Sequence, residues 1–297
     1  MKVLTDFDGT LTNIQHEYEF ELQYIIRVLE EQCGIRREEF ELLYETVWRY
    51  ILQFPDSHGW YHNGRISAYC DEDLFMQAIC VMNQLDEWRN DPPESIVGIM
   101  ERMGSLSFMD IAEDAHAAMN LEPLEHSNTP EPQVAAAFQE LLDRDFEIVV
   151  ASNSPTSRII QKFEYIGLKP VDHENNPSAQ FRVRGHAGKF VLGNNPNPVD
   201  FGPRTIDVDH MGYKKIISEE RPQVVIGDVF SLDLALPAVM AREEPLIYED
   251  MQLYLRTRSY TPDWAISCIQ TPLAGCPASL RFLNNFNDLS SMIRKRF

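Results

Sequence analysis

The first strand-like segment of the chain lies far in sequence from the next one. Residues 2–5, "KVLT", and Phe7 have the composition of a buried β-strand, whereas the next such segment, "FEIVVAS", starts at residue 146. Between them, residues 13–128 carry almost entirely the spacing of amphipathic helices, as in "HEYEFELQYIIRVLEEQCG". The simplest topology is therefore one α/β core with a helical domain inserted just after its first strand.

After a polar, proline-containing linker, the pattern changes to alternating helices and strands. The strand-like segments are "FEIVVAS", "QFRVRGHAG", "QVVIGD" and "WAISCI", and helical segments separate them. Short apolar strands that alternate with helices predict a parallel sheet covered by helices. We expect a Rossmann-like α/β core of residues 1–12 plus 130–297, and an all-helical domain of residues 13–129.

Polar side chains follow the predicted strands at the points where the strands end. They are Asp6 and Asp8, Ser152 and Asn153, and Asp228 with Asp233 shortly after it. Open parallel sheets bind ligands beyond the carboxyl ends of their strands, so these residues are expected at one edge. Two carboxylates about 4 Å apart repel by roughly 4 kcal/mol at an effective dielectric constant near 20. A cation at this edge would offset that repulsion.

The order of these segments resembles the four-motif signature of the haloacid dehalogenase-like hydrolase superfamily. The motifs are "DFDGT", a strand that ends at Ser152, a lysine, and "GDVFSLD". The resemblance covers residues 1–12 and about 130–240, and the helical block lies where members of the phosphatase branch carry a C1 cap domain. It implies a Rossmann-like core and Mg²⁺-dependent phosphoryl chemistry.

The resemblance also implies roles for individual residues. Asp6 would be the nucleophile that forms an aspartyl phosphate, and Asp8 would be the general acid and base. Mg²⁺ would be held by Asp6, Asp228 and Asp233 together with the backbone carbonyl of Asp8. Phosphate oxygens would be held by Ser152, Asn153 and the lysine. Phosphoryl transfer independently needs such parts, namely a nucleophile, charge neutralisation and a proton donor.

Two positions compete for the lysine. Lys189 follows the strand-like "FRVRG" and a glycine-containing turn. Lys214, with Lys215 beside it, begins the helix that leads into "QVVIGD", which is where members of the superfamily often place this lysine. We favour Lys189 and keep Lys214 as the alternative.

Asp8 favours phosphoryl transfer over dehalogenation, which needs no acid at that position. No lysine occurs between Lys2 and Lys162, which argues against a phosphonatase and weakens a phosphomutase interpretation, because both families use a lysine of the cap. We therefore expect a Mg²⁺-dependent phosphomonoester hydrolase that acts on a small phosphorylated metabolite. The alternatives are a phosphomutase, or a non-hydrolytic ligand-binding protein on the same scaffold.

The segment "SHGWYHNGR" at residues 57–65 stands out within the helical block. Trp60, His62 and the cationic Arg65 could face the site and read the substrate, and the alternative is a plain connection between two helices.

Charge and cysteine content indicate the partners and the compartment. The net charge of −20 disfavours nucleic acid and anionic membranes as partners. The five cysteines are scattered without zinc-like spacing, and acidic residues interrupt the short apolar stretch at the N-terminus, so no signal peptide is expected. These features predict a cytoplasmic protein.

Overall fold

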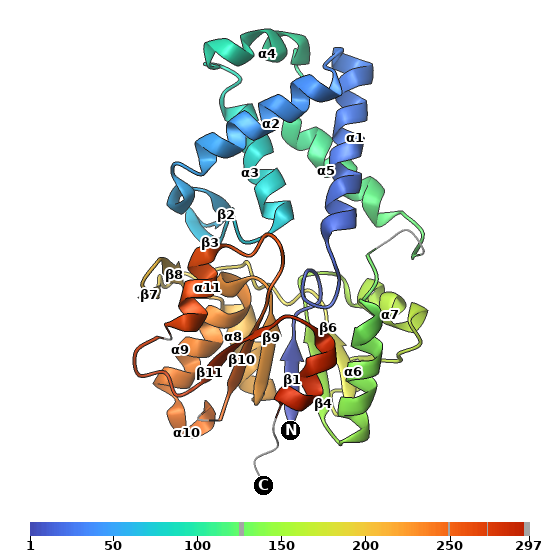
Figure 1. Ribbon diagram of the computed structural model, residues 1–297, viewed down its shortest axis with the longest axis vertical. Helices are drawn as coiled ribbons and strands as arrows, with labels where there is room; N and C mark the ends of the chain where they lie inside the picture. Colours follow the sequence, from blue (N-terminus) through green and yellow to red (C-terminus); the bar gives the residue numbers. More distant parts are fainter. Residues whose placement is uncertain (125–127, 249, 272, 294–297) are drawn as a thin grey trace. The chain divides into compact units, whose positions relative to one another are not determined.

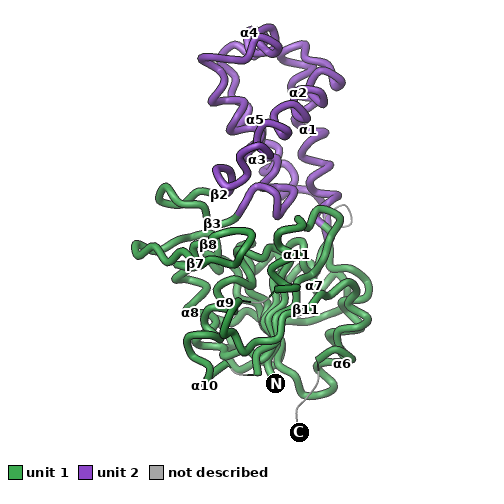
Figure 2. Tube along the Cα trace, turned by 60° about the vertical axis from the view of Figure 1, so that its left-hand side comes forward, with its two compact units in different colours: residues 1–13, 60–68, 129–297 green, residues 14–59, 69–128 purple. Residues whose placement is uncertain are grey.

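The computed structural model describes residues 1–124, 128–248, 250–271 and 273–293. The chain divides into two compact units (Figure 2). The first comprises Met1–Asn13, Trp60–Ala68 and the chain from Thr129 onward, and the second comprises Ile14–Gly59 and Tyr69–Asn128. That these units fold as separate domains with the boundaries expected from the sequence stays a prediction.

The first unit is built on a seven-stranded parallel sheet (Figure 1). The strand order is β11-β10-β9-β1-β4-β6-β5, so β1 lies at the centre, with Val3 between Ile148 and Val224. The strands are β1 (Lys2–Thr5), β4 (Glu147–Ala151), β5 (Val171–Asp172), β6 (Phe181–Arg184), β9 (Val224–Gly227), β10 (Gln252–Arg256) and β11 (Ser279–Leu283). The predicted α/β parallel-sheet core is therefore confirmed.

Helices cover both faces of this sheet. One face packs its valine and isoleucine side chains against α6 (Pro132–Asp143), α7 (Thr156–Tyr165) and the segment formed by η5 (Phe286–Asp288) and α12 (Leu289–Met292). The chain first runs from β1 through β4 towards one edge of the sheet. After β6 it crosses to β9 and then continues through β10 and β11 towards the other edge. Right-handed crossovers then place their helices on the other face; these are α8 (Met211–Glu220), α9 (Ala235–Glu243) and α11 (Asp263–Gln270).

Smaller elements complete the first unit. They are a two-stranded antiparallel ribbon of β7 (Pro198–Asp200) and β8 (Thr205–Asp207), the π-helical turn η4 (Phe230–Leu234) and the short helix α10 (Pro245–Tyr248). The segment "WAISCI" was expected to be a strand, and this is wrong, because it lies in α11. Ala265, Cys268 and Ile269 have helical spacing and bury one side of that helix.

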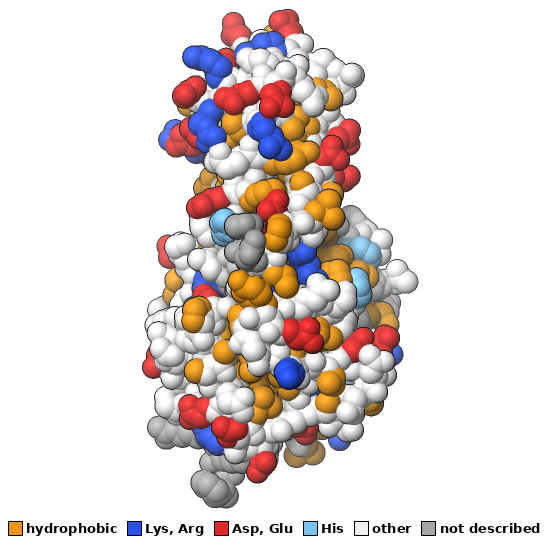
Figure 3. Space-filling model, turned by 90° about the vertical axis from the view of Figure 1, so that its right-hand side faces the viewer, with side chains coloured by type: hydrophobic (Ala, Val, Ile, Leu, Met, Phe, Trp, Pro, Cys, Tyr) orange, Lys and Arg blue, Asp and Glu red, His pale blue; other side chains and the backbone are white. Residues whose placement is uncertain are grey.

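The second unit is helical and has its own apolar core. Ile25, Leu29, Phe40, Leu85 and Phe108 are among the buried side chains of that core. The elements are α1 (Gln15–Cys33), α2 (Arg37–Ile51), η1 (Pro55–Ser57), α3 (Leu74–Glu87), η2 (Glu94–Ile96), α4 (Val97–Met103) and α5 (Phe108–Asn120). On the face drawn in Figure 3, acidic and basic side chains of this unit are interspersed.

The inserted segment is not helical throughout, which corrects the expectation of an all-helical insertion. A two-stranded hairpin of β2 (Gly59–His62) and β3 (Arg65–Tyr69) interrupts it. Asn63 and Gly64 at its tip have φ angles of 52° and 72°. An Asn-Gly pair favours such a turn because both residues tolerate positive φ. The sequence therefore contains the hairpin signal. The two short strands were not expected because the segments on both sides of them have helical periodicity.

A buried cluster of charges joins β1, β6 and α8. The Glu220 side chain is 4% exposed, and its carboxylate accepts hydrogen bonds from Lys2 at 2.9 Å, from Arg184 at 2.9 Å and from Arg182. Burial opposes ionisation of Glu220, but the hydrogen bonds from Lys2 and Arg182 outweigh it and lower the pKa to about 2. Ionised Glu220 therefore stabilises the packing of α8 on the sheet.

We expect Glu220→Gln to lower the free energy of unfolding by roughly 2 to 4 kcal/mol at neutral pH, because the buried cations lose their partner. The pKa of Glu220 is depressed on folding, so its contribution is complete above the unfolded value of 4.5 and is lost as the pH falls towards 2. Denaturant unfolding of both proteins between pH 7 and pH 2.5 tests this. A stability difference that does not shrink on acidification would contradict it.

Candidate active site

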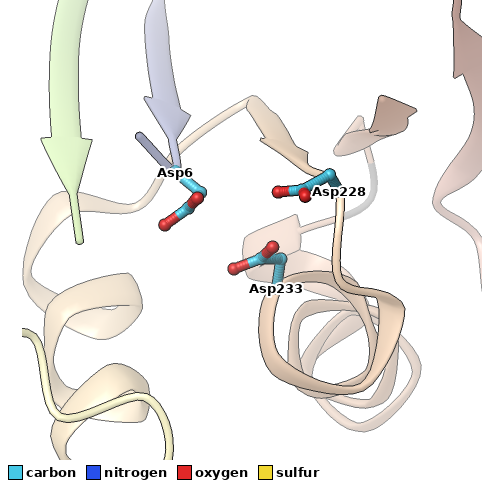
Figure 4. Close-up of side chains that lie close together, drawn as sticks. All are labelled: Asp6, Asp228 and Asp233. Atoms are coloured by element: carbon cyan, nitrogen blue, oxygen red, sulfur yellow. The ribbon is translucent and has the colours of Figure 1, made fainter. Parts of the chain in front are cut away.

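Three carboxylates converge at the carboxyl edge of the sheet (Figure 4). Asp6 follows β1, Asp228 follows β9, and Asp233 lies on η4. Each offers an oxygen within 4.8 Å of the others. Successive strands are added in one direction from β1 and in the opposite direction from β9, so the topological switch point lies between these two strands. Open α/β sheets bind ligands at such a point.

Two glycines allow the carboxylates to come this close. Gly9 has a φ of +75°, and a Cβ there would lie 2.0 Å from Oδ2 of Asp228. A Cβ on Gly227 would lie 2.1 Å from Cβ of Asp233. Thr10 then holds Asp228, since its hydroxyl donates to Oδ1 at 2.7 Å. The motifs "DFDGT" and "GDVFSLD" thus supply both the carboxylates and the space between them.

The structure brings Lys189 to these carboxylates. Its side chain is 2% exposed, and Nζ lies 2.7 Å from Oδ1 of Asp6 and 2.8 Å from Oδ1 of Asp233. Its backbone N–H donates to Oδ1 of Asn153 at 2.8 Å, which fixes the loop after β6. Lys214 and Lys215 lie exposed on α8. Of the candidate lysines, Lys189 is therefore the one placed at the triad.

The second aspartate of "DFDGT" is held by two hydroxyls. Ser152 donates to Oδ2 of Asp8 at 3.1 Å, and Ser154 donates to the same oxygen at 2.7 Å. The Asp8 carboxylate is not part of the triad formed by Asp6, Asp228 and Asp233. Asp8 thus contacts the predicted phosphate-binding serine, and a metal contact through its backbone carbonyl stays a prediction.

The charges in this site are unbalanced. Burial, together with Asp233 and Asp8, raises the pKa of Asp6 to about 7, although Lys189 opposes the rise. Burial disfavours the ammonium of Lys189, but Asp233 and Asp6 outweigh it and raise the pKa of Lys189. One ammonium therefore faces a group of carboxylates. An all-oxygen set of this kind fits a hard divalent cation such as Mg²⁺, which would also keep Asp6 ionised.

Several residues near the site were not anticipated from the sequence. Ser154 and Thr10 stand within or beside recognised motifs, so the hydroxyls in "SNS" and "DGT" were the available signal. Tyr213 donates to the backbone carbonyl of Asp233 at 3.2 Å, and its ring lies 5.0 Å from Nζ of Lys189. Tyr260 donates to Oδ2 of Asp228 at 3.4 Å. Nothing in the local pattern around either tyrosine marks this placement.

The hairpin residues lie against the segment that follows Lys189. The rings of Trp60 and Phe190 have centroids 5.0 Å apart, and the backbone N–H of Leu192 donates to Nδ1 of His62 at 3.2 Å. Arg65 pairs with Asp207 and donates to the backbone carbonyl of Gly193. Each of these three side chains therefore has a structural contact within the first unit. Their role in reading substrate stays a prediction.

No family model matches the chain, and no curated protein matches it. Solved structures do resemble it along most of its length. A haloacid dehalogenase-like family hydrolase from Streptococcus pneumoniae is 10% identical, with 99% of this chain and 98% of that chain covered and a TM-score of 0.43. A 2-haloacid dehalogenase from Pseudomonas syringae is 14% identical, with coverages of 98% and 96% and a TM-score of 0.40.

A predicted phosphoglycolate phosphatase from Haemophilus somnus is 12% identical to this chain. The alignment covers 98% of this chain and 96% of the phosphatase, with a TM-score of 0.46. The fold itself is established by the strand order of the sheet. No helix in the described part of the chain is long and apolar enough to cross a lipid bilayer.

We expect Gly9→Ala to disrupt the triad, because its Cβ would overlap the Asp228 carboxylate. Gly34→Ala is a matched control, since Gly34 also has a positive φ of +62° but nothing lies within 4 Å of the added methyl. Both variants carry left-handed backbone strain of about 1 kcal/mol. Calorimetric titration with Mg²⁺ should show weakened binding for Gly9→Ala alone. Equal affinities in the two variants would contradict this account.

Proposed function

We propose that this protein is a Mg²⁺-dependent phosphomonoester hydrolase of the haloacid dehalogenase-like kind. The observation that carries the proposal is the arrangement of Asp6 and Asp8. Asp6 lies within the carboxylate triad and contacts Lys189, whereas Asp8 is turned to the serine hydroxyls. One carboxylate is thus suited to cation-assisted attack and the other to proton transfer.

The metal-binding residues would be Asp6, Asp228 and Asp233, with the backbone carbonyl of Asp8. When bound, Mg²⁺ would neutralise negative charge at the transferring phosphoryl group. Lys189 contributes a positive charge beside the carboxylate oxygens of Asp6 and Asp233. Together with Ser152 and Asn153, it would bind phosphate oxygens and orient the phosphorus towards Asp6.

The residues then divide the reaction between them. An Oδ atom of Asp6 attacks phosphorus, the bond from phosphorus to the ester oxygen breaks, and Asp8 gives its proton to the leaving alkoxide. In the second half, Asp8 takes a proton from a water molecule that attacks the same phosphorus. The Asp6 carboxylate leaves with its bonding electron pair, and inorganic phosphate is released. The hydroxyls of Ser152 and Ser154 hold Asp8 for both proton transfers.

The substrate class is a small phosphorylated metabolite, as the sequence resemblance implies. The acidic net charge of −20 supports a partner other than nucleic acid or an anionic membrane. A cytoplasmic location belongs to the same proposal. A non-hydrolytic binding role would leave the paired hydroxyls around Asp8 without a purpose, so hydrolysis is the function favoured here.

We expect phosphate release from small phosphomonoesters to require both Mg²⁺ and Asp6. Asp6→Asn removes the nucleophilic oxygen at nearly constant volume, so turnover should fall by about four orders of magnitude or to background. The measurement is phosphate release from a panel of esters with Mg²⁺, with EDTA, and with EDTA followed by added Mg²⁺. Activity that persists in EDTA would contradict the metal requirement, and an active Asp6→Asn protein would contradict covalent catalysis.

Lys189→Met and Lys214→Met form a matched pair, because both remove one ammonium and keep an unbranched side chain. The Lys189 ammonium contacts Asp6 and Asp233, whereas Lys214 is exposed on α8. We expect kcat/KM to fall by about a hundredfold or more for Lys189→Met, the loss typical of one charge-stabilising donor, and to stay near the parent value for Lys214→Met. Saturation kinetics in excess Mg²⁺ test this. The reverse order would place the third motif at Lys214.

A further inference from the structure

Arg258, just beyond β10, lies against the turn that follows the nucleophile. Its Nε donates to the backbone carbonyl of Gly9 at 2.6 Å. Its Nη2 donates to the carbonyl of Thr10 at 3.1 Å and also to the carbonyl of Thr12. The side chain is 10% exposed. A single guanidinium thus contacts three of the four residues that follow Asp8.

These carbonyls need such a donor. The turn closes on itself through N–H groups, because Leu11 and Thr12 both donate to the carbonyl of Phe7, at 2.9 and 3.3 Å. A single helical turn leaves its later carbonyls without partners inside the turn. Their partial negative charge faces Arg258, as it would face a cation at a helix C-terminus. The guanidinium therefore completes the hydrogen bonding of the turn that begins with Asp8.

Glu131 fixes Arg258 in this position. Its Oε1 accepts from Nη1 of Arg258, and its Oε2 accepts from Nη2 of Arg256 at 2.9 Å. Its backbone N–H donates to the carbonyl of Leu11 at 2.9 Å. Two guanidiniums share one carboxylate, which leaves positive charge for the carbonyls of the turn.

The same loop also reaches the metal-binding side of the site. The backbone N–H of Arg258 donates to the hydroxyl of Thr261 at 2.8 Å, and Tyr260 between them donates to Asp228. The loop after β10 therefore contacts the first and the fourth motif together. A displacement of this loop would move the Asp8 turn relative to Asp228.

We propose that Arg258, held by Glu131, is a positioning residue for phosphoryl transfer. It fixes the turn of residues 9–12, and thereby the place of Asp8 opposite the serine hydroxyls. Arg258 contacts neither the triad nor the serines in any hydrogen bond described for it, so it acts through the turn. The proposal rests on the proposed hydrolase function for its catalytic consequence, whereas the ordering of the turn can be measured without any substrate.

The test compares Arg258→Met with Arg144→Met. Arg144 is a matched control, because it also joins a backbone carbonyl, that of Ser290 at 2.8 Å, to a glutamate, Glu140 at 3.7 Å, and both partners lie outside residues 7–12. Hydrogen exchange of peptides that cover residues 7–12 should be about tenfold faster in Arg258→Met than in the parent, while peptides of β4 stay unchanged. Arg144→Met should leave the exchange of residues 7–12 unchanged.

The kinetic arm measures kcat and KM on the phosphomonoester that the parent hydrolyses fastest. We expect kcat to fall by about tenfold to a hundredfold in Arg258→Met with KM within about threefold, because a misplaced acid affects the transition state more than binding. Arg258→Lys keeps the charge and should recover part of the loss.

Each outcome decides the proposal. Exchange and kinetics in Arg258→Met that match those of Arg144→Met would overturn it, as would faster exchange that extends equally through β4. If the parent releases no phosphate, the hydrolase function fails, and the exchange arm still decides whether Arg258 orders the turn. If Arg258→Met does not fold, Glu131→Gln takes its place, with the same faster exchange in residues 7–12 expected and an unchanged rate overturning the proposal.

Discussion

The structure depends on keeping several like charges together at one edge of a sheet. Asp6, Asp228 and Asp233 place oxygens within 4.8 Å of one another, and among the described residues one buried ammonium, that of Lys189, contacts Asp6 and Asp233. At such distances the repulsion of each pair is of the order of several kcal/mol in a partly buried site. The parallel sheet supplies the rigid frame that holds them there, because neighbouring strands end side by side.

The rest of the first unit can be understood as support for that edge. Lys189 is tied to the site by Asn153 on one side and by the ring of Tyr213 on the other. Asp8 is tied by two serine hydroxyls, so the two aspartates of "DFDGT" lie in different electrostatic surroundings. In the proposed reaction this difference would separate the nucleophile from the proton donor, since the environment of each carboxyl group sets its role.

The residues that end strands could be located from the sequence, whereas those that reach the site from loops could not. Asp6 and Asp228 follow apolar strands directly, so periodicity locates them at the sheet edge. Arg258 and Tyr260 follow β10, a strand that was not recognised because "LYLR" is short and carries a buried arginine. The sequence could not decide between Lys189 and Lys214 for another reason. Residues 190–210 add a ribbon between β6 and α8, so the spacing between the lysine and the fourth motif departs from the family pattern.

The hairpin gives that added ribbon a physical role. Trp60 packs on Phe190, the residue next to Lys189, and Arg65 binds Asp207 within β8. An aromatic pair and an ion pair thus anchor the chain on both sides of the turn-rich excursion that starts at Lys189. The excursion also buries apolar side chains of its own, among them Leu192, Phe201 and Ile206, so the hairpin contacts secure its two ends. A piece of the inserted segment therefore belongs, structurally, to the support of Lys189.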